Sequence, residues 1–324
     1  MVNQPLDSLG RRKRTRPTST GKRVTPQEAD LVWFSKLQEH GPLPSSYLLA
    51  YTADMRKSQK RAADRLTDLF NEEETKHGGR YLERPPQQFR TIDSRYNQLV
   101  YDLAPAGRKA LKEAGQTIAA SAKPSGPWLH RFMVSCVTAS IELATLERSD
   151  ITYIPQHQIL KRADVELRYP VAFAEPKSGQ TITKDLIPDA MFGLQYHTPR
   201  GNRFRFFAVE CDRATEPATT TNFNRKSWLR NLLQYREYIG KGLYKEHLRL
   251  TAPMLVLNVT SDEKRLWKMV AVTEQEVGDA GNSYLLFRYA PDFGPVFKPR
   301  GPLTDLLDTP WKRAGQAPFL IDEP

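Results

Sequence analysis

The order of strand-like and helical runs in the second half of the chain constrains the fold most. Three runs rich in apolar, β-branched and aromatic residues follow one another: ITYIPQHQIL, DLIPDAMFGLQY and RFRFFAVEC. A long helical run at 128–148 precedes them, a helix from about Asn224 to Ile239 follows, and the strand PMLVLNVT comes next. A later strand is expected near Lys268 to Val272. These patterns predict a mixed α/β domain in the order α-β-β-β-α-β.

The first half of the chain has a different order. Thr25, Pro26 and Glu28 suit the N-cap, first turn and capping box of a helix that stops before Gly41. A short helix from Ser45 to Tyr51 and a third helix over 58–71 follow. Strand-like segments at RYLER and QLVYDL then flank a Pro-Pro loop, before a helix from about Arg108. Three helices followed by two strands are typical of a winged helix-turn-helix, whose third helix enters the DNA major groove.

A chain of 324 residues can hold two domains of this size. The segment KPSGP breaks the helical pattern and is typical of a linker. We therefore expect an α+β and α/β protein: a basic disordered arm at 1–24, a winged-helix domain at 25–122, a linker at 123–127 and a nuclease-like domain at 128–324.

The formal net charge of +11 favours a polyanionic partner, and we expect double-stranded DNA. The candidate DNA contacts lie in the arm, on the third helix and on the wing: Arg12, Arg14, Lys57, Lys60, Arg61, Arg65, Arg80 and Arg84. Two alternatives stay open at this point. The arm could be a solubilising tail, and the winged helix could serve protein contacts or dimerisation.

Several classes of protein are disfavoured. No apolar run is long enough to span a bilayer, and the basic N-terminus does not resemble a signal peptide. The two cysteines, Cys136 and Cys211, are too few for a disulfide framework, so we expect a cytoplasmic protein without membrane contact. The sequence has no phosphate-binding glycine loop, so no nucleotide cofactor is expected, and no His-x-His pair of the kind that rolling-circle relaxases use.

Carboxylates lie at the ends of two strand-like runs. Asp189 follows Pro188, and Glu210 and Asp212 end the run RFRFFAVECD. Because side chains alternate along a strand, Glu210 and Asp212 should face one way and Cys211 the other. Acids from two adjacent strands suit Mg²⁺ or Mn²⁺, which activates water and neutralises charge on a phosphodiester during cleavage. The alternative is that these acids are solvated at strand ends.

This arrangement resembles the restriction-endonuclease-like, or PD-(D/E)xK, nucleases. Their motif is a Pro-Asp pair at the second strand and Glu-x-Lys on the third, matched here by Pro188-Asp189 and Glu210-Cys211-Asp212. The resemblance implies Asp189, Glu210 and Asp212 as metal ligands, with Glu142 as a helical partner. Since Asp212 replaces the usual lysine, a cation from elsewhere must compensate. Lys226 is the first candidate, with Lys184 and Arg213 behind it.

A narrower resemblance covers roughly residues 25–260. A winged helix followed by PDA, a strand ending in E-x-D-R-x-T-E and a helix with lysine and tyrosine is similar to the replication-relaxation family of plasmids and mobile elements. The matching residues here are Asp189, Glu210, Asp212, Arg213, Thr215, Glu216, Lys226 and Tyr235. The resemblance implies a role in the replication or DNA processing of such elements, with Asp212 as part of the pattern. Gln234 and Tyr238 also form a Q-x-x-x-Y motif similar to one in recombination-type exonucleases.

Two functions remain in view. The first is a metal-dependent endonuclease or nicking enzyme of a mobile element. The second is a DNA-binding replication accessory or transcriptional regulator whose nuclease core is inactive. Whether the protein forms a homodimer is left open by the sequence.

Overall fold

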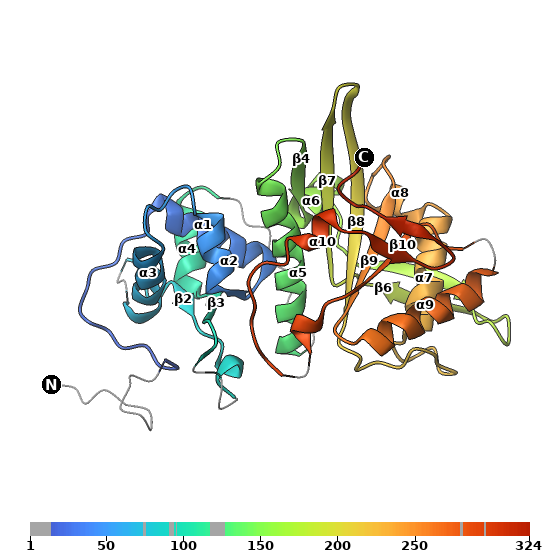
Figure 1. Cartoon of the computed structure of the whole chain (residues 1–324), viewed down its shortest axis with the longest axis horizontal. Helices are drawn as coiled ribbons and strands as arrows, with labels where there is room; N and C mark the ends of the chain where they lie inside the picture. Colours follow the sequence, from blue (N-terminus) through green and yellow to red (C-terminus); the bar gives the residue numbers. More distant parts are fainter. Residues whose placement is uncertain are drawn as a thin grey trace. The chain divides into compact units, whose positions relative to one another are not determined.

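The computed structural model describes residues 14–73, 76–90, 94, 96–116, 127–278, 281–294 and 296–324. The chain divides into two compact units, traced from blue to red in Figure 1. Unit 1 comprises Met1–Ala139 and Val296–Pro302, and unit 2 comprises Ser140–Pro295 and Leu303–Pro324. The division therefore lies inside helix α5 (Trp128–Leu146) and not at the expected linker, of which residues 123–126 lie outside the described part.

Unit 1 combines short helices with a small antiparallel sheet. Its elements in chain order are α1 (Glu28–His40), β1 (Leu43–Pro44), α2 (Ser45–Tyr51), α3 (Gln59–Asn71), β2 (Leu82–Glu83), the 3-10 helix η1 (Pro86–Phe89), β3 (Val100–Leu103) and α4 (Pro105–Glu113). The strand order is β1-β3-β2, with β3 antiparallel to both neighbours. The sequence predicted the helices, but it missed β1.

The helix caps explain where α1 and α3 begin. Ser58 caps α3, accepting a hydrogen bond from the backbone N–H of Arg61. The expected Thr25 cap of α1 is wrong: Gln27 is the N-cap, and Gln27 and Asp30 form the reciprocal capping box. Thr25 serves a different purpose, because its carbonyl accepts a hydrogen bond from Arg65.

The core of unit 1 forms where the apolar faces of its helices meet the sheet. Trp33, Phe34 and Leu66 are fully buried, and the Phe34 ring stacks on Tyr81 at 5.6 Å. Trp33 donates its indole N–H to the carbonyl of Leu48, which ties α1 to α2. Burial of this apolar surface is the main stabilising contribution to the unit.

Unit 2 is built on a seven-stranded mixed sheet in the order β12-β11-β10-β9-β8-β7-β4. Its strands are β4 (Ile151–Pro155), β7 (Ala190–Thr198), β8 (Gly201–Asp212), β9 (Met254–Thr260), β10 (Leu285–Tyr289), β11 (Trp311–Arg313) and β12 (Gln316–Phe319). Strands β4, β7 and β8 are antiparallel neighbours, whereas β8, β9 and β10 run parallel. The helices are the end of α5, α6 (Gln156–Ala163), α7 (Trp228–Gly240), α8 (Leu243–His247), α9 (Glu263–Val277), the 3-10 helix η4 (Pro291–Phe293) and α10 (Asp305–Asp308).

One predicted strand is too long, another is wrong, and one hairpin was missed. The run at 151–160 is a strand only to Pro155 and continues as α6, which buries Ile159 and Ala163 four residues apart. Residues 268–272 lie in α9, where Asp262 caps the helix and buried side chains recur with a helical period. Between α6 and β7, strands β5 (Tyr169–Ala174) and β6 (Thr181–Leu186) form a separate antiparallel pair.

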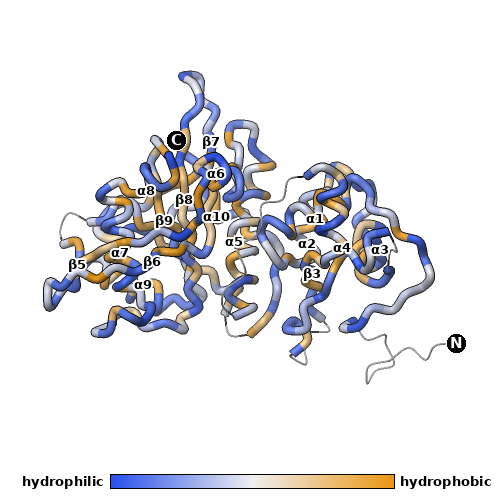
Figure 2. The backbone as a smooth tube through the Cα atoms, turned by 180° about the vertical axis from the view of Figure 1, so that it is seen from behind, coloured by the Kyte–Doolittle hydropathy of each residue, from blue (hydrophilic) through white to orange (hydrophobic). Residues whose placement is uncertain are grey.

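Alternation along β8 decides which residues face the helices. Phe206 and Ala208 belong to a core cluster with residues of α7 and α9, so the even-numbered side chains of β8 point to that helical layer. Phe207 points to the opposite face and stacks on Phe192 of β7 at 4.9 Å. Figure 2 shows apolar residues along the central strands and polar residues toward the tip of the β7–β8 hairpin.

Candidate functional site

Asp189 lies beside Glu210 because of the bend between β6 and β7. The backbone N–H of Asp189 donates to the carbonyl of Val209 at 3.1 Å, and Asp189 Oδ2 accepts the N–H of Cys211 at 2.8 Å. These two bonds hold Asp189 against β8 on either side of Glu210. Asp189 of the Pro-Asp pair and the strand acid Glu210 therefore lie side by side.

Glu210 has a strongly perturbed carboxyl group. Protein atoms surround it closely, although it keeps some accessible surface, and Tyr235 of α7 donates its hydroxyl to Oε1 at 2.5 Å. Burial raises the pKa of Glu210 well above its ordinary value, and the neighbouring charge of Asp189 raises that pKa further. The Tyr235 hydrogen bond and the charge of Lys226 lower the pKa, and Glu216 raises it. The net direction is upward, so burial and the neighbouring Asp189 disfavour the ionised form of Glu210.

Tyr235 is a buried positioning group for Glu210. Burial raises the pKa of its phenol well above the ordinary value, and the charge of Glu210 adds to this rise. Tyr235 therefore stays protonated and remains a donor. Tyr235 is completely buried, so it also packs in the core.

Asp212 does not join the other two acids. Its Oδ2 accepts two hydrogen bonds from the Arg265 guanidinium of α9, at 2.8 and 2.6 Å, and its Oδ1 accepts the N–H of Ala214. Among the described residues, Asp189, Glu210 and Asp212 do not bring three ligand atoms within 4.8 Å of one another. The expectation of one three-acid cluster is therefore not met, because Arg265 holds Asp212 in an ion pair.

The other proposed catalytic residues differ in how closely they are linked to Asp189 and Glu210. Lys226 is exposed just before α7, and its positive charge lowers the pKa of Glu210. Glu142 is buried in α5 and is not among the main influences on the pKa of Glu210. Lys184 lies in β6, and its carbonyl accepts the side-chain N–H of Gln234. Arg213 follows directly after β8. Lys226 is thus the cation best linked to the acids.

The Q-x-x-x-Y motif is occupied by structural contacts. Gln234 bridges Arg230 of its own helix and the carbonyl of Lys184, which fastens the β5–β6 pair to α7. The Tyr238 hydroxyl contacts His247 Nδ1 at 2.7 Å. Both motif residues are buried, so neither is available to a ligand in this structure.

Arg265 is the site residue that the sequence patterns missed. Arg265 is 53 positions from Asp212, and the strand expected at 268–272 obscured the helix that carries it. The cap at Asp262 was the available signal, because an aspartate before an apolar helical period indicates a helix start. Arg230 lies in α7, where burial lowers its pKa and the charge of Glu216 opposes this effect.

The donor set at Asp189 and Glu210 fits a hard divalent cation. Mg²⁺ and Mn²⁺ bind through one or two carboxylates and retain several waters. A carboxylate can accept hydrogen bonds and bind a cation at the same time, so the bonds from Cys211 and Tyr235 are compatible with metal binding. A cation would also offset the repulsion that raises the pKa of Glu210.

The basic residues proposed to contact DNA separate into two groups in unit 1. Lys57, Lys60 and Arg61 are exposed at the start of α3. Arg65 instead binds the buried carboxylate of Asp30 at 2.6 Å, where Arg56 also binds. Two exposed candidates, Lys60 and Arg61, therefore lie on α3 and a third, Lys57, lies just before it, whereas Arg65 is held inside the unit.

Most of the candidate DNA-contacting residues of the wing and the arm already make contacts within the protein. The buried Arg84 guanidinium lies 4.0 Å from the Phe70 ring centre and donates to the hydroxyl of Tyr101. Arg80 pairs with Glu73 at 2.7 Å, and Arg14 donates to the carbonyl of Asn97. Arg12 lies outside the described residues. Arg84 therefore stabilises the unit, and the sequence alone did not separate it from surface cations.

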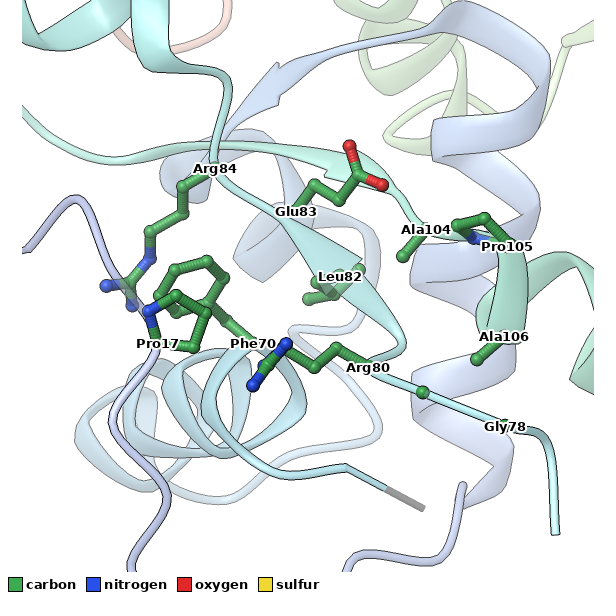
Figure 3. Close-up of a pocket in the computed structure, with 11 residues that line it drawn as sticks. Pro17, Phe70, Gly78, Arg80, Leu82, Glu83, Arg84, Ala104, Pro105 and Ala106 are labelled. Carbon is green, nitrogen blue, oxygen red and sulfur yellow. The ribbon is translucent and has the colours of Figure 1, made fainter. Parts of the chain in front are cut away.

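A depression of about 350 Å³ lies between the end of α3 and the start of α4. Figure 3 shows Arg84 beside the Phe70 ring, with Arg80 on another side of the depression. Its lining is largely apolar and includes Leu82, Ala104 and Pro105. The carboxyl group of Glu83 also lines it, and burial and the neighbouring charge of Asp102 raise the pKa of that group.

A protein-family model described as replication-relaxation matches residues 34–251, about two thirds of the chain. The chain belongs to the replication-relaxation family. The matched range contains Asp189, Glu210, Asp212 and Lys226, so the candidate site lies within the family region. Membership connects the chain to replication. No curated protein and no solved structure matches it. None of the helices in the described ranges is long and apolar enough to cross a membrane.

Proposed function

We propose that this replication-relaxation protein binds duplex DNA through unit 1 and cleaves or nicks DNA with a divalent metal held in unit 2. Its process would be the replication or transfer of a plasmid or mobile element. The observation that carries the cleavage proposal is the convergence of Asp189 and Glu210, whose mutual repulsion makes a cation favourable between them.

DNA binding by unit 1 is supported by its element order and surface charge. The succession α1-β1-α2-α3-β2-β3 with sheet order β1-β3-β2 is that expected of a winged helix. Lys57, Lys60 and Arg61 are exposed at the start of α3, the position of a recognition helix. These side chains suit phosphate contacts, which supply most of the affinity for DNA.

Cleavage by unit 2 is supported by the order α5, β4, β7, β8, α7 and β9, which is the nuclease-like order with α6 and the β5–β6 pair inserted. Asp189 and Glu210 would hold the metal, and the metal would activate water and neutralise charge on the phosphate. Tyr235 orients Glu210 by its hydrogen bond. Lys226 would bring positive charge toward the phosphate in place of the missing strand lysine. Asp212 would act through its ion pair with Arg265 and not as a metal ligand.

A second function is favoured by the same contacts. Tyr235 satisfies Glu210 with a hydrogen bond, and Arg265 neutralises Asp212 without any metal. A nuclease-like core stabilised in this way could serve a DNA-binding accessory or regulator without catalysis. The two functions differ in whether the core binds a divalent cation.

The test uses the full chain with supercoiled and linear DNA, in Mg²⁺ or Mn²⁺ and then in EDTA. We expect metal-dependent nicking or cleavage that Asp189→Ala and Glu210→Ala each abolish while DNA binding persists. Asp185→Ala is the matched control, because this exposed carboxylate of β6 pairs with Arg168 outside the site. Lys226→Ala should slow cleavage strongly.

Cleavage that survives both Asp189→Ala and Glu210→Ala would show that the site is misplaced. If no preparation cleaves DNA and calorimetry detects no divalent-metal binding, the non-catalytic function is the correct one.

A further inference from the structure

The tip of the β7–β8 hairpin is a basic ribbon that extends beyond the rest of its sheet. The last partner of β7 in β4 is at the pair Ile151–Tyr196, and β8 pairs with β9 only from Phe206 onward. Beyond the pair Tyr196–Arg203 the hairpin continues as two strands, with one further backbone hydrogen bond from His197 to the carbonyl of Asp150; it is the long hairpin of unit 2 in Figure 1. At about 3.4 Å per residue, the tip reaches roughly 10 Å past the pair at Tyr196.

The charge of this hairpin has one sign. Residues 190–209 include Arg200, Arg203 and Arg205 and contain no aspartate or glutamate. The acids at its base, Asp150 and Asp322, both pair with Arg148, whose positive charge offsets one of their two negative charges. The ribbon is thus a local positive surface.

The three arginines are held differently. Arg205 is anchored: it donates to the carbonyl of Glu323 and lies over the rings of Tyr196 and Phe319. Arg203 points from the same face of β8, two residues nearer the tip, and Arg200 lies in the turn. Both are exposed, and neither side chain has a hydrogen bond, ion pair or ring contact within the described part of the chain.

The ribbon is also preorganised. Thr198 donates its hydroxyl to the carbonyl of Gly201 at 2.7 Å and accepts the N–H of Arg200. Gly201 adopts a φ of 107°, which a residue with a side chain rarely takes, so the two-residue loop is fixed by its sequence. Phe204 is 41% exposed on the other face, next to the arginines.

We propose that the β7–β8 hairpin inserts into the major groove of duplex DNA and contacts phosphates through Arg200 and Arg203. The major groove is about 12 Å wide and 8.5 Å deep and admits a two-stranded ribbon, which matches the roughly 10 Å that the tip extends. Glu210 lies eight residues from Asn202, roughly 27 Å along β8, so this contact is separate from the carboxylate site. The proposal rests on duplex DNA being the ligand of the protein, as proposed above.

The first test measures DNA affinity against salt for the full chain. The double variant Arg200→Ala/Arg203→Ala should lower the slope of log K against log salt by about 1.8, or 0.9 per lost phosphate contact. Between 50 and 200 mM salt, the affinity advantage of the unmodified protein should therefore shrink by about twelve-fold. Lys161→Ala/Arg162→Ala on α6 is the matched control, because it removes two exposed charges of the same unit.

The second test locates the contact. Cys136 and Cys211 are buried, so a cysteine introduced by Asn202→Cys would carry a tethered iron–EDTA group selectively while keeping the arginines. We expect DNA strand scission in a discrete patch from this position, and none from Ser178→Cys at the exposed turn between β5 and β6.

The outcomes are distinguishable. An unchanged salt slope, an equal loss in the α6 control, or absent scission from the Asn202→Cys protein would overturn the hairpin contact while leaving DNA binding by α3 intact. An unmodified protein that binds no duplex would refute the DNA-binding function and the hairpin contact together.

Discussion

The buried carboxylate of Asp30 gives a sharp test of which cations on α3 serve DNA and which serve folding. Asp30 is fully buried and accepts hydrogen bonds from Arg56 and Arg65, each at 2.6 Å, and from the backbone N–H of Gln27. Asp30→Ala would leave two guanidinium groups without their counter-charge. Loss of one partner from a buried ion pair costs about 3–5 kcal/mol, so we expect unit 1 to lose that amount of unfolding free energy.

Arg65→Ala should have a smaller effect of the same kind. Asp30 would keep Arg56, and the lost charged hydrogen bonds are worth about 1.5–3 kcal/mol. Lys60→Ala and Arg61→Ala remove exposed side chains and should change stability by no more than about 0.5 kcal/mol. The ranking of these variants by their effect on DNA binding is the reverse of their ranking by stability. Each of these two variants should reduce the salt slope by about 0.9, and Arg65→Ala should leave it unchanged at temperatures where the variant is folded.

The assay pairs urea unfolding, followed by tryptophan fluorescence to which the buried Trp33 of unit 1 contributes, with DNA titrations at several salt concentrations. Arg65→Lys is a useful control, because it keeps the charge but cannot reproduce the planar fork of the guanidinium. The reasoning is refuted if Arg65→Ala is as stable as the unmodified protein and lowers the salt slope. That result would return Arg65 to the DNA surface that the sequence alone suggested.

Three further predictions concern unit 2. Glu210→Gln should stabilise the metal-free protein at neutral pH. Because the folded-state pKa of Glu210 is raised, its contribution to stability is complete below the ordinary value of 4.5 and is lost as the pH rises through the folded pKa. Urea unfolding of both proteins at several pH values measures this difference. Tyr235→Phe should raise the pKa of Glu210 further, because the variant lacks the hydrogen bond that stabilises the ionised carboxylate. Infrared spectroscopy of the carboxyl group during a pH titration measures this shift. An unchanged pKa would contradict the assigned contact. A double-mutant cycle with Arg265→Met and Asp212→Asn should give a coupling energy of about 1–3 kcal/mol in unfolding experiments, whereas additive effects would show that the pair is not energetically linked.

The sequence by itself determined the local features of this protein. The helical period of apolar residues over 58–71 predicted α3 almost to the residue, because amphipathic spacing acts within a few positions. Alternation along β8 predicted that Glu210 and Asp212 share a face, and both point to the layer of α7 and α9. The Pro188-Asp189 pair was correctly placed beside β8, because strand neighbours bring a bend to a predictable edge.

Only the tertiary structure decided what these side chains do. Asp212 is bound by a residue 53 positions away, and Arg65 by one 35 positions away, so no local pattern could distinguish them from exposed charges. Residues 156–160 and 268–272 have apolar patterns that suit either a strand or a helix, and the buried faces against the sheet selected the helix. Short-range rules therefore fixed where α3, β8 and the bend at Asp189 lie. Packing between distant segments determined whether each charge is buried in an ion pair or left exposed on the surface.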